Sequence, residues 1–179
     1  MTDTQEAPAI VPDFGDDASG DRKICFICSK GNLDMAYPAL IMANGALGEG
    51  IETHIFFTFW GMDMINKETM HDLKFTLLGN TAMHPPGHFK MSMPQGLGGL
   101  PGMTRMATKM LKKQIADQGV PEIPEFLDLL ADSGAQMWAC KMSVDMMGLE
   151  MEDMHESVQA IINVTEFMEL AEGAQVIFV

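Results

Sequence analysis

Cysteines and long apolar runs are both scarce in this sequence. Its 179 residues include three cysteines, an odd and low number that argues against a disulfide framework and favours a reducing compartment. No apolar run approaches the roughly 20 residues of a transmembrane helix. Residues 1–6 lack the basic start and apolar middle of a signal peptide. We therefore expect a cytoplasmic protein without a transmembrane segment.

Basic residues are also few. The chain has 11 Lys and Arg against 25 Asp and Glu, a formal net charge of −14, and an acidic surface repels the phosphates of nucleic acid. No G-x-G-x-x-G, P-loop or G-x-S-x-G motif is present, so a nucleotide site is disfavoured. We expect neither a nucleic-acid partner nor a bound cofactor.

The first 21 residues differ from the rest of the chain. They contain Pro and Gly and six carboxylates, without a single Lys or Arg: Asp3, Glu6, Asp13, Asp16, Asp17 and Asp21. A segment this polar cannot bury enough apolar surface to fold. We predict a flexible acidic tail over residues 1–21 and a single domain over residues 22–179, which is long enough for a sizeable core.

Residues 22–179 alternate between short apolar segments and amphipathic ones. Residues 23–28 form a nearly continuous apolar run, typical of a strand buried on both faces and hence of a parallel sheet. Strands are predicted over residues 23–28, 52–59, 135–139, 159–162 and 175–179. Helices are predicted over residues 35–47 (with Pro38 in the first turn), 62–73, 103–118, 125–131 and 165–171, with helical turns near 143–148 and 150–157. Such alternation predicts a three-layer α/β domain on a parallel five-stranded sheet.

Residues 79–118 interrupt this alternation as an inserted loop and helix. The part from 79 to 102 is rich in Gly, Pro and Met and has no periodicity, and the helix that follows carries a basic stripe. A loop of this length inside a compact domain is usually functional or mobile.

The inserted loop contains two histidines four residues apart among methionines. Their soft imidazole and thioether ligands would suit Cu(I); the residues are His84, His88, Met83, Met91 and Met93. Alternatively, the methionines provide adaptable apolar contact for a partner protein, or residues 79–106 touch a membrane peripherally. No thiolate or carboxylate stands beside the histidines, so we favour partner binding and predict no metal site.

Cys140 stands where a strand gives way to a helix. The carboxyl end of a strand, facing a helix start, is where an open α/β sheet usually has its reactive groups. Ser143 can cap the helix that follows. The free N–H groups and the dipole at the start of that helix favour a thiolate, and Lys141 adds a cation beside Cys140. The alternative is an inert buried cysteine that acts as a small apolar residue.

Cys25 and Cys28 form a C-x-x-C pair within the first predicted strand. Side chains three residues apart on a strand point to opposite faces, so these two sulfurs cannot form a disulfide or chelate one metal ion. Both are most simply core residues. Cys28 nevertheless ends its strand at the same edge of the sheet as Cys140, and if the two strands are neighbours Cys28 could assist or resolve Cys140.

Residues 139–149, Ala-Cys-Lys-Met-Ser-Val-Asp-Met-Met-Gly-Leu, resemble the cysteine signature of the DsrE/DsrF-like family. Residues 59–63 (Phe-Trp-Gly-Met-Asp) and the Gly-rich insertion over residues 96–106 are similar to the branch of this family that carries such an insertion. The resemblance covers residues 22–179 and leaves the acidic tail outside.

The resemblance implies a flavodoxin-like α/β domain that forms homo-oligomers and handles sulfane sulfur. Cys140 would accept sulfur as a persulfide and pass it on, a sulfurtransferase-like activity, with Lys141 and Ser143 holding the anionic terminal sulfur. Its partners would be other sulfur carriers or rhodanese-like proteins. A role for Cys25 or Cys28 is not secured by the resemblance. A non-catalytic interaction module and a Cu(I)-binding protein remain the rival hypotheses.

Overall fold

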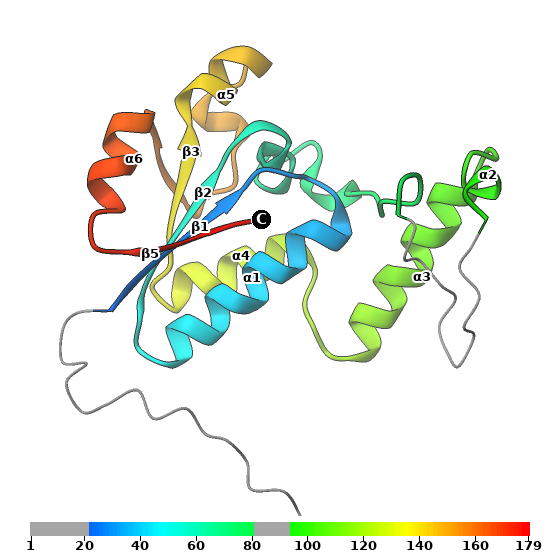
Figure 1. Ribbon diagram of the computed structural model, residues 1–179, viewed down its shortest axis with the longest axis horizontal. Helices are drawn as coiled ribbons and strands as arrows, with labels where there is room; N and C mark the ends of the chain where they lie inside the picture. Colours follow the sequence, from blue (N-terminus) through cyan, green and yellow to red (C-terminus); the bar gives the residue numbers. More distant parts are fainter. Residues whose placement is uncertain (1–21, 81–93) are drawn as a thin grey trace, which may run out of the picture.

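The strands assemble into one parallel sheet at the centre of the molecule (Figure 1). The structure is a computed structural model that describes residues 22–80 and 94–179. The predicted acidic tail and the histidine pair His84 and His88 lie outside the described residues. Within the described part of the chain, no helix combines the length and apolar character that crossing a bilayer requires.

All five predicted strands are present, and each pairs in parallel with its neighbours. The sheet order is β4-β3-β2-β1-β5. The strands are β1 (Lys23–Cys28), β2 (Glu52–Phe57), β3 (Gln136–Cys140), β4 (Val158–Ile162) and β5 (Gln175–Phe178). In β2 every residue after Glu52 is buried, as expected of a strand covered on both faces. The predicted α/β class with a parallel five-stranded sheet is confirmed.

Helices cover the two faces of the sheet unequally. From β1 to β4 the chain moves across the sheet in one direction, so right-handed crossovers bring α1 (Leu33–Gly48) and α4 (Ile123–Asp132) to one face. The return from β4 to β5 runs the other way, which brings the short helix α6 (Val164–Leu170) to the opposite face. There Phe167 stacks on Phe56 with ring centroids 4.4 Å apart.

Three local predictions are wrong. Residues 62–73 do not form an α-helix but two 3-10 helices, η1 (Phe59–Met64) and η2 (Met70–Asp72), because long-range bonds such as Lys67 N–H to Asp153 C=O hold the backbone between them. The predicted turn over residues 150–157 shortens to η3 (Met151–Asp153). Pro38 lies inside α1, beyond its first turn, because the helix already begins at Leu33.

The described end of the inserted region, residues 94–118, forms an arm beside the sheet (Figure 1). It contains the short helix α2 (Gln95–Gly98) and the predicted helix, α3 (Met103–Asp117). Thr108 fixes α3 to the rest of the domain, because its hydroxyl accepts a hydrogen bond from Phe75 N–H at 3.0 Å. The remaining helix, α5 (Lys141–Met147), follows β3 directly and positions the candidate site.

Candidate functional site

Cys140 ends β3 and is the N-cap residue of α5, as the sequence predicts. Gly148 ends this helix with a φ of 64°, a left-handed conformation that glycine adopts without strain. The Cys140 side chain is only 2% exposed. Its thiol therefore lies beneath the surface at the carboxyl edge of the sheet.

Two hydroxyl groups lie beside this thiol. Ser143 Oγ accepts a hydrogen bond from Phe59 N–H at 2.8 Å and lies 3.2 Å from Thr58 Oγ1. Both hydroxyls also hydrogen-bond to the Cys140 sulfur, and each has one proton that it can donate when this sulfur is a thiolate. The prediction that Ser143 caps the helix is wrong, because α5 begins at Lys141 and Ser143 lies fully buried within it.

These donors change the acidity of Cys140. Burial by itself raises the pKa of the thiol, because a thiolate is poorly solvated inside the protein. The Thr58 and Ser143 hydroxyls and the backbone N–H groups of Ser143 and Met142 oppose it, and together they hold the pKa of Cys140 below the ordinary value of a cysteine. Burial without such donors raises the pKa of Cys25 to about 11 and that of Cys28 to about 12.

Lys141 is paired with a carboxylate of its own helix. Its ammonium pairs with Asp145 one helical turn later, with 3.1 Å between Nζ and Oδ1, and both side chains are more than half exposed. The main contributions that lower the pKa of Cys140 are hydrogen bonds from uncharged groups. The thiolate is therefore favoured by hydroxyl and backbone donors rather than by the neighbouring cation.

The segment after β2 completes the site, and sequence reasoning missed its Thr58. Phe59 has a φ of 46°, and among the described residues it is the one non-glycine with a positive φ. This strained conformation lets its N–H reach Ser143. Gly61 is required for close approach, since a Cβ there would lie 2.0 Å from the carbonyl oxygen of Cys28. The signals available were a hydroxyl residue directly after a strand and the Phe-Trp-Gly sequence.

Exposed apolar side chains flank the site. They come from η1 and from α5, and they are Phe59 (45% exposed), Trp60 (64%), Met142 (56%) and Met146 (56%). We call these four residues the apolar rim. Large apolar side chains that remain exposed together indicate a surface that another molecule covers.

Cys28 lies apart from Cys140. A role for Cys28 beside Cys140 depended on their strands being neighbours, and this condition is not met, because β2 lies between β1 and β3. The two sulfurs also face opposite sides of the sheet: Cys28 packs in the core beneath α1, whereas Cys140 and Cys25 belong to the cluster around Phe56. The prediction that Cys25 and Cys28 point to opposite faces is confirmed, and all three cysteines are free thiols.

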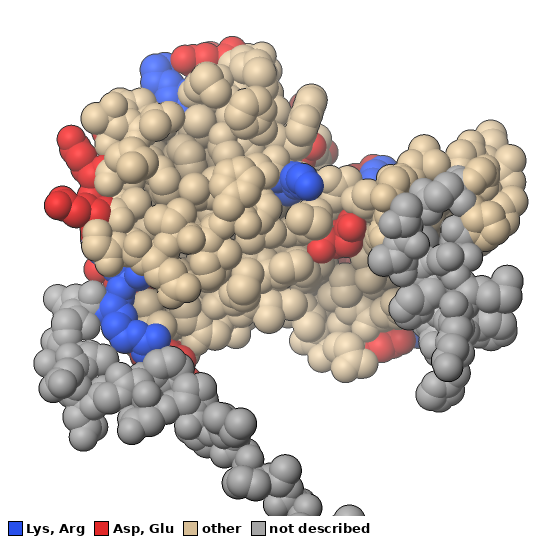
Figure 2. All heavy atoms as spheres, viewed as in Figure 1, with Lys and Arg blue, Asp and Glu red and all other residues tan. Residues whose placement is uncertain are grey.

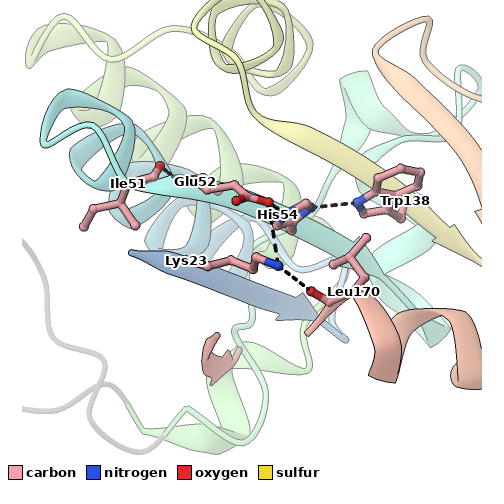
Figure 3. A network of polar contacts seen from close by, with 7 residues as sticks. Lys23, Ile51, Glu52, His54, Trp138 and Leu170 are labelled. Carbon is pink, nitrogen blue, oxygen red and sulfur yellow. Dashed lines mark hydrogen bonds and ion pairs between the residues drawn. The ribbon is translucent and has the colours of Figure 1, made fainter. Parts of the chain in front are cut away.

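A polar network around the buried His54, on the face that α6 covers, was not predicted (Figure 3). His54 Nε2 lies 2.7 Å from Glu52 Oε1, and Trp138 Nε1 donates to His54 Nδ1 at 3.2 Å. Lys23 joins the network through Glu52 and the carbonyl of Leu170. Both ring nitrogens of His54 are therefore occupied, so the network is structural. No group of three or more His, Cys, Asp or Glu within the described ranges could hold a metal ion.

The fold and the site define a class: an α/β protein with a cysteine of lowered pKa at the carboxyl edge of a parallel sheet. A sequence model of the DsrE/DsrF/DrsH-like family matches residues 20–179, and the chain belongs to this family. The sulfur carrier protein DsrE2 of Allochromatium vinosum is 37% identical over 139 residues, which cover 77% of this chain and 86% of that protein.

Two further proteins are similar to this chain, one in sequence and one in fold. YrkE of Bacillus subtilis, an uncharacterized protein, is 26% identical over 160 residues, or 88% of this chain and 97% of YrkE. The solved structure of MTH1491 from Methanobacterium thermoautotrophicum, a protein of unknown function, superposes with a TM-score of 0.54. It covers 89% of this chain and all of that chain at 10% identity, which supports the fold alone.

Proposed function

We propose that this protein is a sulfur carrier that holds sulfane sulfur as a persulfide on Cys140 and passes it on in a relay. The observation that carries the proposal is the set of uncharged donors around Cys140, which favours the thiolate in a buried position. The relationship to the sulfur carrier protein DsrE2 supports the same role. A thiolate is the nucleophile that such transfer needs.

The transfer step is a thiolate exchange. Cys140–S⁻ attacks the outer sulfur of a donor persulfide R–S–SH, a new S–S bond forms at Cys140, and the old one breaks. The donor leaves as R–S⁻ and takes up the proton, which yields R–SH and Cys140–S–S⁻. The reverse exchange with an acceptor thiolate returns Cys140 to its starting state. No separate general base is proposed, because the lowered pKa of Cys140 itself favours the thiolate.

The donors that favour the thiolate also suit the persulfide. The terminal sulfur of Cys140–S–S⁻ is anionic, and the hydroxyls of Thr58 and Ser143 would donate to it. Lys141 would join them only when its pair with Asp145 opens. We assign the sulfur to Cys140 alone, because Cys28 lies on another face of the sheet and its pKa is raised to about 12.

The apolar rim is the proposed docking surface for relay partners, other sulfur carriers or rhodanese-like proteins. Cys140 is 2% exposed, so a donor sulfur reaches it only when side chains between η1 and α5 move aside. Burial of the rim by a partner would also exclude water from the persulfide during transfer. A protein-bound donor therefore suits the site better than a small polysulfide free in solution.

We further propose that the protein forms homo-oligomers in the cytoplasm. Large apolar side chains stand exposed on β5 and α6: Val176 (48%), Phe178 (69%), Val164 (59%) and Met168 (63%). The face of the molecule in Figure 2, which includes β5, carries few charged side chains. A second copy would cover these surfaces. Three free thiols suit the reducing environment of the cytoplasm.

Sulfane sulfur released by cyanide as thiocyanate tests the proposal. After incubation with a persulfide donor and removal of excess reagent, the wild type should release one sulfur per chain. Cys140→Ser should release none, while Cys28→Ala and Cys25→Ala should match the wild type. Sulfur that persists in a folded Cys140→Ser protein would refute the assignment.

A further inference from the structure

A basic cleft between α3 and the segment after η2 has no role in the site described above. Its volume is about 500 Å³, and its walls are Asp72, Lys74, Arg105, Thr108, Lys109 and Lys112. On α3 the three basic residues stand at positions i, i+4 and i+7, so they share one face of the helix. Four cations therefore meet one carboxylate in a protein whose formal net charge is −14.

The positive charge of the cleft is largely unpaired. Asp72 is already paired with Lys74, and the Lys112 ammonium donates to the carbonyl oxygen of His71 at 2.8 Å. Neither Arg105 nor Lys109 forms an ion pair with any residue in the described ranges 22–80 and 94–179. By contrast, Lys113 on the same helix is paired with Asp117 at 2.7 Å.

The sequence limits which carboxylates of this chain remain to pair with Arg105 and Lys109. Outside the described residues the chain consists of residues 1–21 and 81–93, and the second segment contains no Asp or Glu. Residues 1–21 contain six carboxylates and no Lys or Arg. The acidic tail is therefore the part of the chain whose charge complements the cleft.

The apolar side chains of α3 and of the acidic tail also suit each other. On α3, Met106 and Met110 directly follow Arg105 and Lys109 in the sequence, and they are 52% and 45% exposed. The tail contains Ile10, Val11 and Phe14 between its carboxylates. Methionine adapts to irregular apolar partners, so a basic helix with exposed methionines suits an acidic segment that also carries apolar residues.

The tail is long enough to reach the cleft of its own molecule. It joins the described structure at Arg22, before β1, whereas the cleft lies beside Lys74, whose carbonyl oxygen accepts from Leu33 N–H at the start of α1. These positions are at opposite edges of the sheet. The segment from Glu6 to Asp21 spans at most about 55 Å when extended, and a domain of this size is about 40 Å across.

We infer that the acidic tail binds the basic cleft of its own molecule. The tail thereby pairs the unpartnered cations of α3 and screens the cleft from other acidic molecules. Because Asp72 and Lys74 also line the neighbouring cavity that reaches Trp60 of the apolar rim, a bound tail lies next to the proposed partner surface.

Zero-length cross-linking of the full-length protein tests this inference. A carbodiimide joins a carboxylate to a lysine amine in direct contact, and peptide mass spectrometry identifies the pairs. Links from tail carboxylates to Lys109 or Lys112 should exceed those to Lys113 about tenfold, and they should disappear in 1 M salt, where the Debye length is about 3 Å. Arg105→Gln should weaken the links to Lys109, although Lys109 itself is unchanged. Lys113→Gln is the matched control and should leave them unaffected.

An equal mixture of isotope-labelled and unlabelled protein separates the tail of the same chain from that of a second copy. The inference requires linked peptides that carry a single isotope. Linked pairs of mixed isotope would overturn it, and so would tail links spread evenly over Lys30, Lys67, Lys113 and Lys141. Absence of tail links to α3 at low salt would also overturn the inference, and it would indicate that an acidic partner binds the cleft instead. Sulfur loading on Cys140 is unaffected by any of these results, so the two proposals fail independently.

Discussion

Replacing Thr58 with valine removes one hydrogen-bond donor from the Cys140 sulfur and keeps the shape of the side chain. Ser143 still accepts from Phe59 N–H in this variant, so the backbone of η1 keeps its contact with α5. A matched control lies on the preceding strand: Thr53 of β2 is also buried and donates to the carbonyl oxygen of Ile51, at the other end of β2 from the site. Thr53→Val tests whether loss of a buried hydroxyl from β2 has any general effect.

The size of the effect follows from the charge on the acceptor. A hydrogen bond to a charged group contributes about 1.5–3 kcal/mol, so its loss leaves at least about tenfold less thiolate at a pH below the pKa of Cys140. The remaining thiolate is more basic and therefore a better nucleophile, which offsets about threefold of this loss. At a pH below the midpoints of both proteins, the Cys140 alkylation rate should therefore fall about three- to fourfold at the lower end of this range.

The assay is the rate of iodoacetamide alkylation of Cys140, followed by peptide mass spectrometry as a function of pH. Because the pKa of Cys140 is lowered in the wild type, its midpoint should lie below that of an ordinary cysteine. The Thr58→Val midpoint should shift to higher pH, and above both midpoints this variant should react faster than the wild type. Coincident profiles, or an equal shift in Thr53→Val, would refute the role given to the hydroxyl.

Three more predictions concern neighbouring residues. Ser143→Ala should also shift the alkylation midpoint of Cys140 to higher pH. In urea titrations it should lower the free energy of unfolding by about 1–3 kcal/mol, because Phe59 N–H loses its acceptor. Unchanged stability would contradict the importance of that hydrogen bond. Lys141→Ala should leave the alkylation midpoint within error of the wild type, since Lys141 pairs with Asp145; a shift as large as that of Thr58→Val would show that the cation matters. Gly61→Ala should destabilise the protein by about 1–3 kcal/mol or more, because the new Cβ would meet the Cys28 carbonyl. Gly45→Ala is the control: it has open space in α1 and should stabilise the protein by about 0.5–1 kcal/mol. Similar effects at both positions would refute the close approach at Gly61.

The strands were predictable because burial on both faces leaves a local pattern. Continuous apolar runs such as residues 23–28 identify strands of a parallel sheet without knowledge of their neighbours. Residues 62–73 were predicted as a helix because their apolar residues have a helical spacing. Their backbone is instead held by a hydrogen bond from Lys67 N–H to the carbonyl oxygen of Asp153, far along the chain. Strand order is likewise non-local, and therefore the position of β2 between β1 and β3 could not be predicted from the two cysteines.

The candidate site was predictable only in part. Cys140 was found because the end of a strand and the start of a helix are both visible in the sequence. Thr58 was missed because its contact with Ser143 joins residues 85 positions apart. The pairing of Lys141 was predictable, since Asp145 stands four residues later on the same helix, a spacing that pairs opposite charges.

Intact-protein mass spectrometry after incubation with a persulfide donor tests the central claim most directly. The wild type and Cys28→Ala should each gain the mass of one sulfur atom, reversibly with dithiothreitol, and Cys140→Ser should gain none. Transfer of that mass to an added acceptor thiol would complete the relay. A folded Cys140→Ser protein that gains sulfur as the wild type does, or a wild type that gains none, would contradict the account.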